Sequence, residues 1–385
     1  MSLRIGFDAI RALHNTTGLG NYARGVLRGL YHATPQHALH LYSPKPAAAA
    51  FRDFPAEIGA ALHRPTDAST PVARATWRTF RLGRAAARDE MQLYHGLTHE
   101  IPRDLPRTGV PSVVTFADLI YEKHPEYFPL FDRWSYRWRY RWSARHADAI
   151  VAISAQTRDD LVECYGIDAA RITVVPPARD AAFGIMAPNT ERALVRAKYA
   201  LPSEFVLSVG TLEPRKNHDV LLRSLANIRP AQAPPLVLVG RDGGSMSALE
   251  ATIRRLGLGE RVVVRTDVST PDLPALMQCA SLFLYPSRVE GFGMPIVEAL
   301  SAGVPVVATR GGCLVEAGGP GSRYVGGDDV DGWATAITEL VADNAARASM
   351  RAAGHEHARH FDRGRVAAQL LGVYDAVMAN RGTAS

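Results

Sequence analysis

Short runs of apolar residues alternate with longer stretches of helical periodicity along most of the chain. Strands that alternate with helices form parallel sheets, so this pattern predicts an α/β protein. In the first half, strands are predicted at Arg4–Asp8, Leu39–Ser43, Gln92–His95, Ser112–Phe116, Ala149–Ile153 and Ile172–Val175. In the second half, strands are predicted at Phe205–Val209, Leu236–Val239, Arg261–Val264, Leu282–Tyr285 and Pro305–Ala308.

The stretch between the two series, from Ala178 to Leu201, is more loosely patterned. Two series joined by one linker predict two Rossmann-like domains that face each other across a cleft. We place the first domain at residues 1–180, the second at 181–365 and a terminal helix within 366–385. The length of 385 residues also favours two domains, because single cores rarely grow beyond about 250–300 residues.

Composition indicates a folded protein, with 47% hydrophobic and 21% charged residues. The three cysteines, Cys164, Cys279 and Cys313, have no ligand-like spacing and are typical of reduced thiols in a cytoplasmic protein. The first residues enter a strand directly, and no apolar run approaches the ~18 residues of a membrane span. We therefore expect a cytoplasmic protein.

The segment from Ser287 to Leu300 places two carboxylates, Glu290 and Glu298, eight residues apart across a turn from a buried strand into a helix. The intervening Gly291, Phe292 and Gly293 leave their amides free at a positive helix end, with Pro295 at the first helical position. Oxygens of a sugar or a diphosphate bind well in such a place. Without this context, Glu290 would be a solvated loop residue, and Glu298 would interact only with the helix dipole.

A second segment, Val206 to Asn217, runs from a strand through Gly210 into a turn that carries Arg215 and Lys216. Two cations would lie at the carboxyl edge of a parallel sheet, where open α/β sheets bind ligands. There they could neutralise a diphosphate leaving group without a metal ion. The alternative is an exposed basic turn.

Both segments resemble motifs of retaining glycosyltransferases of family four, which have the two-domain GT-B fold, and the resemblance covers nearly all of the chain. It implies that Glu290 and its neighbouring amides hold the donor sugar, and that Glu298 accepts hydrogen bonds from the ribose. It also implies that the last helix, about Gly364 to Asn380, crosses back onto the first domain. Many relatives carry an additional arginine where this chain has Thr211, so the phosphate grip is expected to rest on Arg215 and Lys216.

The loop after the first strand contains Gly18 and Gly20 and leads into a helix expected near Asn21. Its glycines permit a close backbone approach, and the helix start offers amides to an anion. The loop resembles a family segment that lies beside the donor diphosphate. No third glycine follows at the offset of a dinucleotide fingerprint, which counts against an NAD enzyme.

The segment Val113–Leu119 resembles a family segment with a histidine where this chain has Ala117. The following Asp118 is a candidate for binding acceptor or sugar hydroxyls, with a turn-capping role as its alternative. His95 and His99 could supply the missing imidazole, although buried or surface histidines with structural hydrogen bonds are the commoner case.

No metal site is predicted. His355, His357 and His360 have suitable spacing, but arginines intersperse them. The formal net charge is +6, and two series of arginines recur at helical spacing: Arg74, Arg78, Arg81, Arg84 and Arg88, then Arg133, Arg137, Arg141 and Arg145.

The second arginine series runs beside Trp134, Trp138 and Trp142. A basic, tryptophan-bearing helix face can lie on an anionic membrane surface; alternatively the tryptophans belong to the core. Nucleic acid is a weaker interpretation because no nucleic-acid-binding motif accompanies the stripe.

The sequence thus predicts a retaining, metal-independent hexosyltransferase without a cofactor. The donor would be a nucleoside-diphosphate sugar, with GDP-mannose as the first candidate, and the acceptor a glycan or lipid-linked glycan. The enzyme could then lie at the inner face of the membrane. The alternatives are a sugar-nucleotide epimerase of the same fold and a non-catalytic sugar-nucleotide-binding protein, the latter suggested by Ala117.

Overall fold

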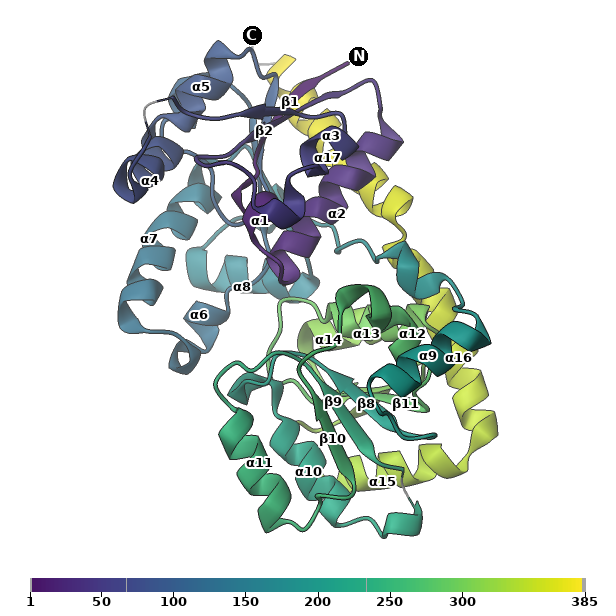
Figure 1. Ribbon diagram of the computed structural model, residues 1–385. Helices are drawn as coiled ribbons and strands as arrows, with labels where there is room; N and C mark the ends of the chain where they lie inside the picture. The colour runs from purple at the N-terminus through teal and green to yellow at the C-terminus, as the bar shows by residue number, and fades with distance from the viewer. Residues whose placement is uncertain (1, 67, 233, 383–385) are drawn as a thin grey trace. The chain divides into compact units, whose positions relative to one another are not determined.

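The computed structural model describes residues 2–66, 68–232 and 234–382. The chain forms two compact units: unit 1 contains the residues up to Ala178 and those from Arg363 onward, and unit 2 is Arg179–Asp362. Each unit has one all-parallel sheet with helices on both faces (Figure 1). The predicted organisation as two parallel-sheet α/β domains is confirmed.

The sheet of unit 1 has the order β3-β2-β1-β4-β5-β6-β7. Its strands are β1 Arg4–Asp8, β2 Ala38–Tyr42, β3 Ala61–His63, β4 Leu93–Gly96, β5 Ser112–Phe116, β6 Ala149–Ala152 and β7 Ile172–Val174. The six predicted strands are present with ends shifted by one residue at most. The edge strand β3 was not predicted, because its three residues are only partly buried or exposed and leave no apolar run.

Helices cover both faces of this sheet. One face packs against α1 Ile10–His14, α2 Gly18–Ala33, α3 Phe54–Glu57 and α17 Arg363–Gly382. The other packs against α4 Pro71–Phe80, α5 Leu82–Arg88, α6 Ile120–Lys123, α7 Leu130–His146 and α8 Ala155–Tyr165. Alternate strand residues serve the two faces: Leu93 lies in the first core and Tyr94 in the second.

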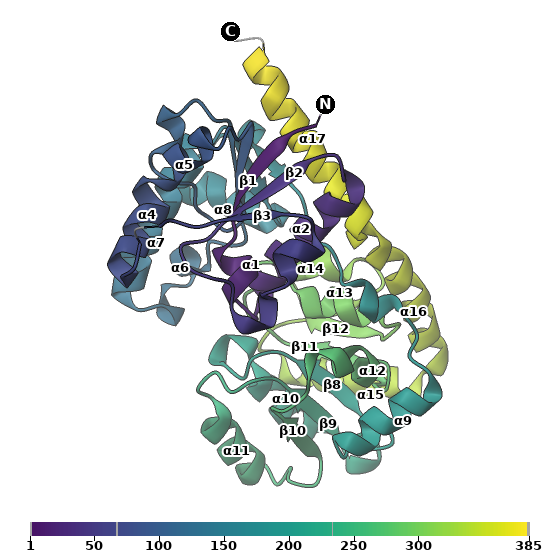
Figure 2. The same cartoon turned by 45° about the horizontal axis from the view of Figure 1, so that its top comes forward.

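The C-terminal helix belongs to unit 1, as predicted. It runs beside α2 (Figure 2), and its Tyr374 hydroxyl is 2.7 Å from Nδ1 of His95. Near its end, Arg381 donates to Asp148 and to the carbonyl of Gly109. Residues distant in sequence thereby close the first core.

Helix α2 begins at Gly18, three residues earlier than the predicted start near Asn21. A Cβ on Gly20 would lie 1.9 Å from the carbonyl oxygen of Asn15, whereas a Cβ on Gly18 would have no neighbour within 4 Å. Gly20 is therefore required by the chain's own backbone. The buried Arg24 fixes the same turn by donating to the carbonyls of Ala12 and Asn15.

We expect Gly20→Ala to lower the free energy of unfolding by about 2–3 kcal/mol, because a backbone atom must move to admit the methyl group. Gly18→Ala, at the first position of the same helix, is the matched control and should be neutral or slightly stabilising. Denaturant titration measures both values. Equal stabilities of the two variants would contradict the proposed close approach.

The sheet of unit 2 has the order β10-β9-β8-β11-β12-β13. Its strands are β8 Val206–Val209, β9 Leu236–Val239, β10 Val262–Arg265, β11 Leu282–Tyr285, β12 Val306–Thr309 and β13 Arg323–Val325. The five predicted strands are present, and the three-residue edge strand β13 was again not predicted. The helices are α9 Asn189–Lys198, α10 His218–Ala226, α11 Met246–Arg255, α12 Leu273–Met277, α13 Met294–Ser301, α14 Gly312–Gly318, α15 Val330–Ala342 and α16 Asn344–Ala358.

Both sheets have a topological switch point, where consecutive connections leave in opposite directions along the sheet. In unit 1 it lies between β1 and β4, and in unit 2 between β8 and β11. Open α/β sheets bind ligands beyond the carboxyl ends of the strands at such points. Among the described residues, no helix is both long enough and apolar enough to cross a bilayer.

Candidate active site

The switch point of unit 2 brings together the two sequence segments with candidate site residues. Arg215 and Lys216 follow β8, and Glu290 follows β11. Since β8 and β11 are adjacent in the sheet, the cations and the carboxylate meet. Arg215 Nη1 donates to Glu290 Oε2 at 2.9 Å, and Lys216 Nζ bonds to Glu290 Oε1.

Two further side chains complete the shell of Glu290. The hydroxyls of Tyr285 and Ser287 donate to Oε1 at 2.8 and 2.6 Å, and Lys216 Nζ also donates to the Tyr285 hydroxyl at 3.0 Å. Sequence reasoning missed both residues. A signal existed, since Tyr285 ends the predicted strand and Ser287 stands three residues before Glu290.

Glu290 is held as a carboxylate. Burial by itself would raise its pKa, but the charges of Lys216 and Arg215 and the hydrogen bonds outweigh burial and lower the pKa to about 2. Arg215 has a second carboxylate partner, Glu213, at 2.7 Å. Two cations and two carboxylates thus form one polar cluster, in which the cations are positioned before any ligand arrives.

The loop from Glu290 into α13 is shaped by Gly293. This residue has φ 109°, a left-handed conformation that favours glycine, and a Cβ there would lie 3.0 Å from Leu314. The helix begins at Met294, which puts Pro295 at the second helical position instead of the predicted first. Phe292 is buried and packs edge-on against Phe361.

The backbone amides of Gly291, Phe292 and Gly293 have no hydrogen-bond acceptor within the part of the chain that the structure describes. They precede the positive end of α13. This arrangement can receive an anion or sugar oxygens.

Glu298 lies on α13 in a different environment from Glu290. Burial, and secondarily the carboxylate of Asp180, raises its pKa to about 7. No described residue donates a hydrogen bond to its carboxylate. A half-buried carboxyl group that lacks a protein donor is suited to accept hydrogen bonds from a ligand's hydroxyls.

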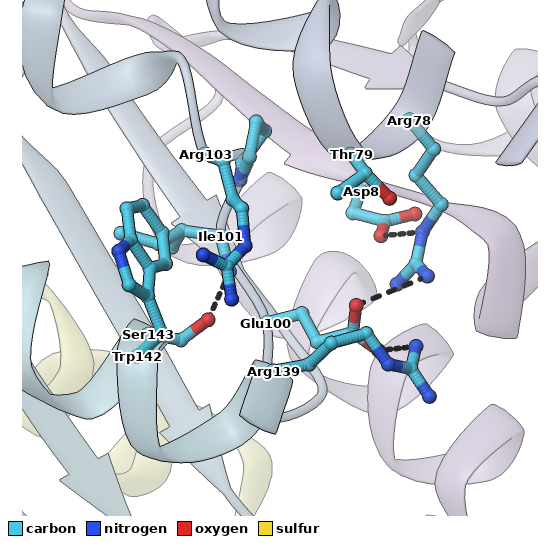
Figure 3. A pocket seen from close by; sticks show the side chains of 10 residues that line it. Asp8, Arg78, Thr79, Glu100, Ile101, Arg103, Arg139, Trp142 and Ser143 are labelled. Atoms are coloured by element: carbon cyan, nitrogen blue, oxygen red, sulfur yellow. Dashed lines mark hydrogen bonds and ion pairs between the residues drawn. The ribbon is translucent and has the colours of Figure 1, made fainter. Parts of the chain in front are cut away.

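The switch point of unit 1 is occupied by a chain of charges (Figure 3). Asp8 ends β1 and accepts a hydrogen bond from Arg78 at 2.6 Å, and Glu100 bridges Arg78 and Arg139. These groups line a cavity of only about 10 Å³. The two carboxylates are satisfied by arginines from α4 and α7, so this edge is filled by the protein's own side chains.

The remaining predicted residues of unit 1 lie in loops of the same sheet. Asp118 Oδ1 accepts the amide of Ile120 at 3.1 Å, which is the turn-capping contact considered from the sequence. Gly18, Leu19 and Gly20 form the first turn of α2, where their amides have no hydrogen-bond acceptor among the described residues. Unit 1 therefore holds Gly18, Gly20 and Asp118, whereas unit 2 holds the other candidate residues.

Both candidate histidines are buried and hydrogen-bonded within the protein. His95 is fully buried, its ring nitrogens contact Tyr374 and Thr115, and burial lowers its pKa to about 3. His99 Nε2 accepts the amides of Ala117 and Asp118. His99 thereby fixes the turn after β5.

Comparison with solved structures identifies the fold. The chain superposes on HepE from Anabaena, a structure in complex with UDP, with a TM-score of 0.73 at 20% identity, covering 98% of this chain and 100% of that one. Two doubly wound units with a returning C-terminal helix are the GT-B arrangement. The chain therefore has the GT-B fold.

Comparison with protein families and related sequences identifies the class of protein. Residues 192–357 match the model of glycosyl transferases group 1, and residues 16–183 match the model of Glycosyltransferase Family 4. The O-antigen chain mannosyltransferase B of Escherichia coli is 31% identical over 286 residues, 73% of this chain and 74% of that protein. The chain belongs to this family of glycosyltransferases.

A second relative is the GDP-mannose-dependent alpha-(1-6)-phosphatidylinositol monomannoside mannosyltransferase of Mycolicibacterium smegmatis. It is 33% identical over 223 residues, which are 55% of this chain and 58% of the relative. The match thus spans little more than half of that protein.

Proposed function

We propose that this protein is a retaining hexosyltransferase that moves mannose from GDP-mannose to a hydroxyl of a glycan or lipid-linked glycan, without a metal ion. The observation that carries the proposal is the cluster of Arg215, Lys216 and Glu290 beside the unengaged amides of residues 291–293. Mannose is the first choice because the two mannosyltransferases above are among the relatives.

In this proposal the two cations receive the donor diphosphate. Negative charge accumulates on the diphosphate as its bond to the donor sugar breaks. Fixed cations in a partly buried site stabilise that charge. Lys216 is buried and Arg215 is half-buried, so water screens them weakly. The departing phosphate oxygen accepts the acceptor's proton, which is consistent with alanine at position 117.

The two glutamates have separate roles. Glu290, fully ionised and held by four donors, positions the cations and presents its edge and the adjacent amides of Gly291 to Gly293 to the donor sugar. Glu298 accepts the ribose hydroxyls. Gly18 and Gly20 contribute amides to the donor diphosphate, and Asp118 binds an acceptor or sugar hydroxyl.

The decisive experiment is a panel of GDP- and UDP-sugars with lipid-linked glycan acceptors. Transfer with retained anomeric configuration, unchanged by EDTA, is the expected result. Donor epimerisation without transfer would favour the epimerase, and tight nucleotide binding without turnover would favour a non-catalytic binding protein. A soluble nucleotide-sugar donor together with a lipid-linked acceptor would fit an enzyme in the cytoplasm, at the inner face of the membrane.

We expect the affinity for GDP-mannose to rise with pH up to about 7. Ribose hydroxyls donate to the ionised form of Glu298, whose pKa is raised to about 7, so binding must release a proton below that value. The diphosphate of GDP-mannose is esterified at both ends and does not titrate there. Titration calorimetry in two buffers of different ionisation enthalpy measures the released proton.

Two variants control this experiment. Glu298→Gln should bind the donor more weakly, by about 1–3 kcal/mol, with no pH dependence in this window. Asp180→Asn removes the neighbouring charge that raises the pKa of Glu298, so the rise in affinity should move to lower pH. Wild-type affinity that is constant from pH 6 to about pH 8 would remove the ribose role from Glu298.

A further inference from the structure

Helix α7 has an exposed face whose composition is unusual for a soluble protein. Its opposite side is anchored in the core by Tyr140, Ser143 and Ala144. The outward side chains, here called the α7 face, are Leu130, Phe131, Trp134, Trp138, Arg141 and Arg145. At 3.6 residues per turn these six positions fall within an arc of about 100°.

The apolar members of the α7 face are strongly exposed. The exposed fractions are 78% for Leu130, 75% for Phe131, 67% for Trp134 and 47% for Trp138. Single exposed apolar residues are common, but four on one helical stripe mark an interaction site. The tryptophans predicted to lie either in the core or on a surface are thus exposed at Trp134 and Trp138.

Cations surround the tryptophans in a groove of about 360 Å³. The guanidinium of Arg103, from the loop after β4, lies 3.5 Å from the ring centre of Trp138 and 4.7 Å from that of Trp142. Arg137 is paired with Glu122. By contrast, no carboxylate among the described residues pairs with Arg141 or Arg145, so the groove attracts anions.

The order of residues along α7 discriminates between anionic partners. Leu130 and Phe131 begin the helix, Trp134 and Trp138 follow, and Arg141 and Arg145 come last. Hydrocarbon, the amphipathic boundary and the phosphate layer of a membrane surface follow each other in this order. A soluble glycan or a nucleic acid would leave Leu130 and Phe131 in water, and Arg103 already covers a face of Trp138.

We propose that the α7 face docks unit 1 obliquely onto anionic phospholipid, with Leu130, Phe131 and Trp134 at the acyl boundary and Arg141 and Arg145 at the phosphates. The proposal rests on the proposed function only for the lipid-linked acceptor that would bring the enzyme to a membrane. The contacts that carry it lie entirely within unit 1 and do not involve the cluster of Arg215, Lys216 and Glu290.

The test is cosedimentation of the full chain with sucrose-loaded vesicles of phosphatidylcholine alone, or with about one third phosphatidylglycerol. Binding is expected to the anionic vesicles and should weaken with salt. Arg141→Gln with Arg145→Gln should reduce the partition coefficient about 30-fold, because each arginine near an anionic surface contributes about fivefold. Leu130→Ser with Trp134→Ser should reduce it roughly tenfold to a hundredfold.

Matched variants from unit 2 control for general loss of charge and apolar surface. Ile185 and Leu194 are as exposed as the residues of the α7 face, at 68% and 71%, and Arg254 and Arg255 are exposed on α11. The double variants Ile185→Ser with Leu194→Ser and Arg254→Gln with Arg255→Gln should bind vesicles as the wild type does. An equal loss in these controls would overturn the assignment to α7.

A second measurement on the wild-type chain does not depend on the variants folding. Brominated acyl chains in the anionic vesicles should quench tryptophan fluorescence, since Trp134 would reach the acyl boundary. Absence of both binding and quenching overturns the proposal, as does binding to an acidic polysaccharide or single-stranded DNA but not to vesicles. The assay contains no donor, so an inactive enzyme that binds vesicles would contradict the proposed reaction and leave the docking surface standing.

Discussion

Glu290→Gln is expected to lower kcat about 10²–10³-fold while the affinity for GDP-mannose stays near that of the wild type. The carboxylate has four donors, including both cations, and an amide cannot accept from all of them. Lys216 and Arg215 would lose their fixed positions at the proposed leaving group. Steady-state transfer and calorimetric donor binding measure the two quantities separately.

Glu213→Gln is the control for this change, because the Glu213 carboxylate also pairs with Arg215 but forms no ion pair with Lys216 among the described residues. It should reduce kcat much less. A similar loss in both variants would show that turnover depends on the pairing of Arg215 and not on Glu290. Since unpaired buried cations destabilise proteins, thermal unfolding must confirm that Glu290→Gln is folded under the assay conditions.

The same carboxylate predicts how stability responds to acid. The pKa of Glu290 is lowered to about 2 in the folded chain, against an ordinary value of 4.5. The stability that this group contributes is complete above pH 4.5 and is lost as the pH falls towards 2. Replacement of Glu290 by Gln should flatten this part of the pH–stability profile.

Lys216→Ala is expected to reduce kcat by about 10²–10³-fold, and Arg215→Ala by somewhat less. Lys216 is the more buried cation, with a side chain 10% exposed against 26% for Arg215, and it also contacts Tyr285. Their proposed work is at the leaving diphosphate, so selectivity among donor sugars should change little. Single-turnover transfer from GDP- and UDP-sugars measures both effects.

Arg288→Ala, on the loop that follows β11, serves as the control for loss of a cation. Arg288 is paired with Asp328 at 2.7 Å and donates to Asn217 at 2.8 Å, and it has no role at the diphosphate in this proposal. Its replacement should leave kcat within a few fold. If the wild type strictly required a divalent metal ion, the proposal that Arg215 and Lys216 alone bind the diphosphate would be contradicted.

The hydrophobic pattern predicted the fold well because parallel strands buried on both faces are short continuous apolar runs. It failed at β3 and β13, which lie at sheet edges and have only three residues each. Both strands have partly exposed side chains and form no apolar run, whereas the edge strands β7 and β10 are more apolar and were predicted.

The candidate site was predictable in its parts but not in its contacts. Arg215 and Lys216 were expected at one strand end and Glu290 at another, with roles that seemed separate. Their ion pairs depend on β8 lying beside β11, although more than 70 residues separate them in sequence. Tyr285 and Ser287 belong to the site only because β8 and β11 are adjacent in the sheet.

The sequence by itself determined the two α/β domains, the two strand-to-helix turns and the residue types at each turn, since these follow from local periodicity and backbone preferences. Only the tertiary structure decided the protonation of the two glutamates. Glu290 contacts Arg215 and Lys216, which follow another strand, whereas the pKa of Glu298 reflects burial and the charge of Asp180. A carboxyl pKa depends on neighbours in space, and those neighbours are set by strand order.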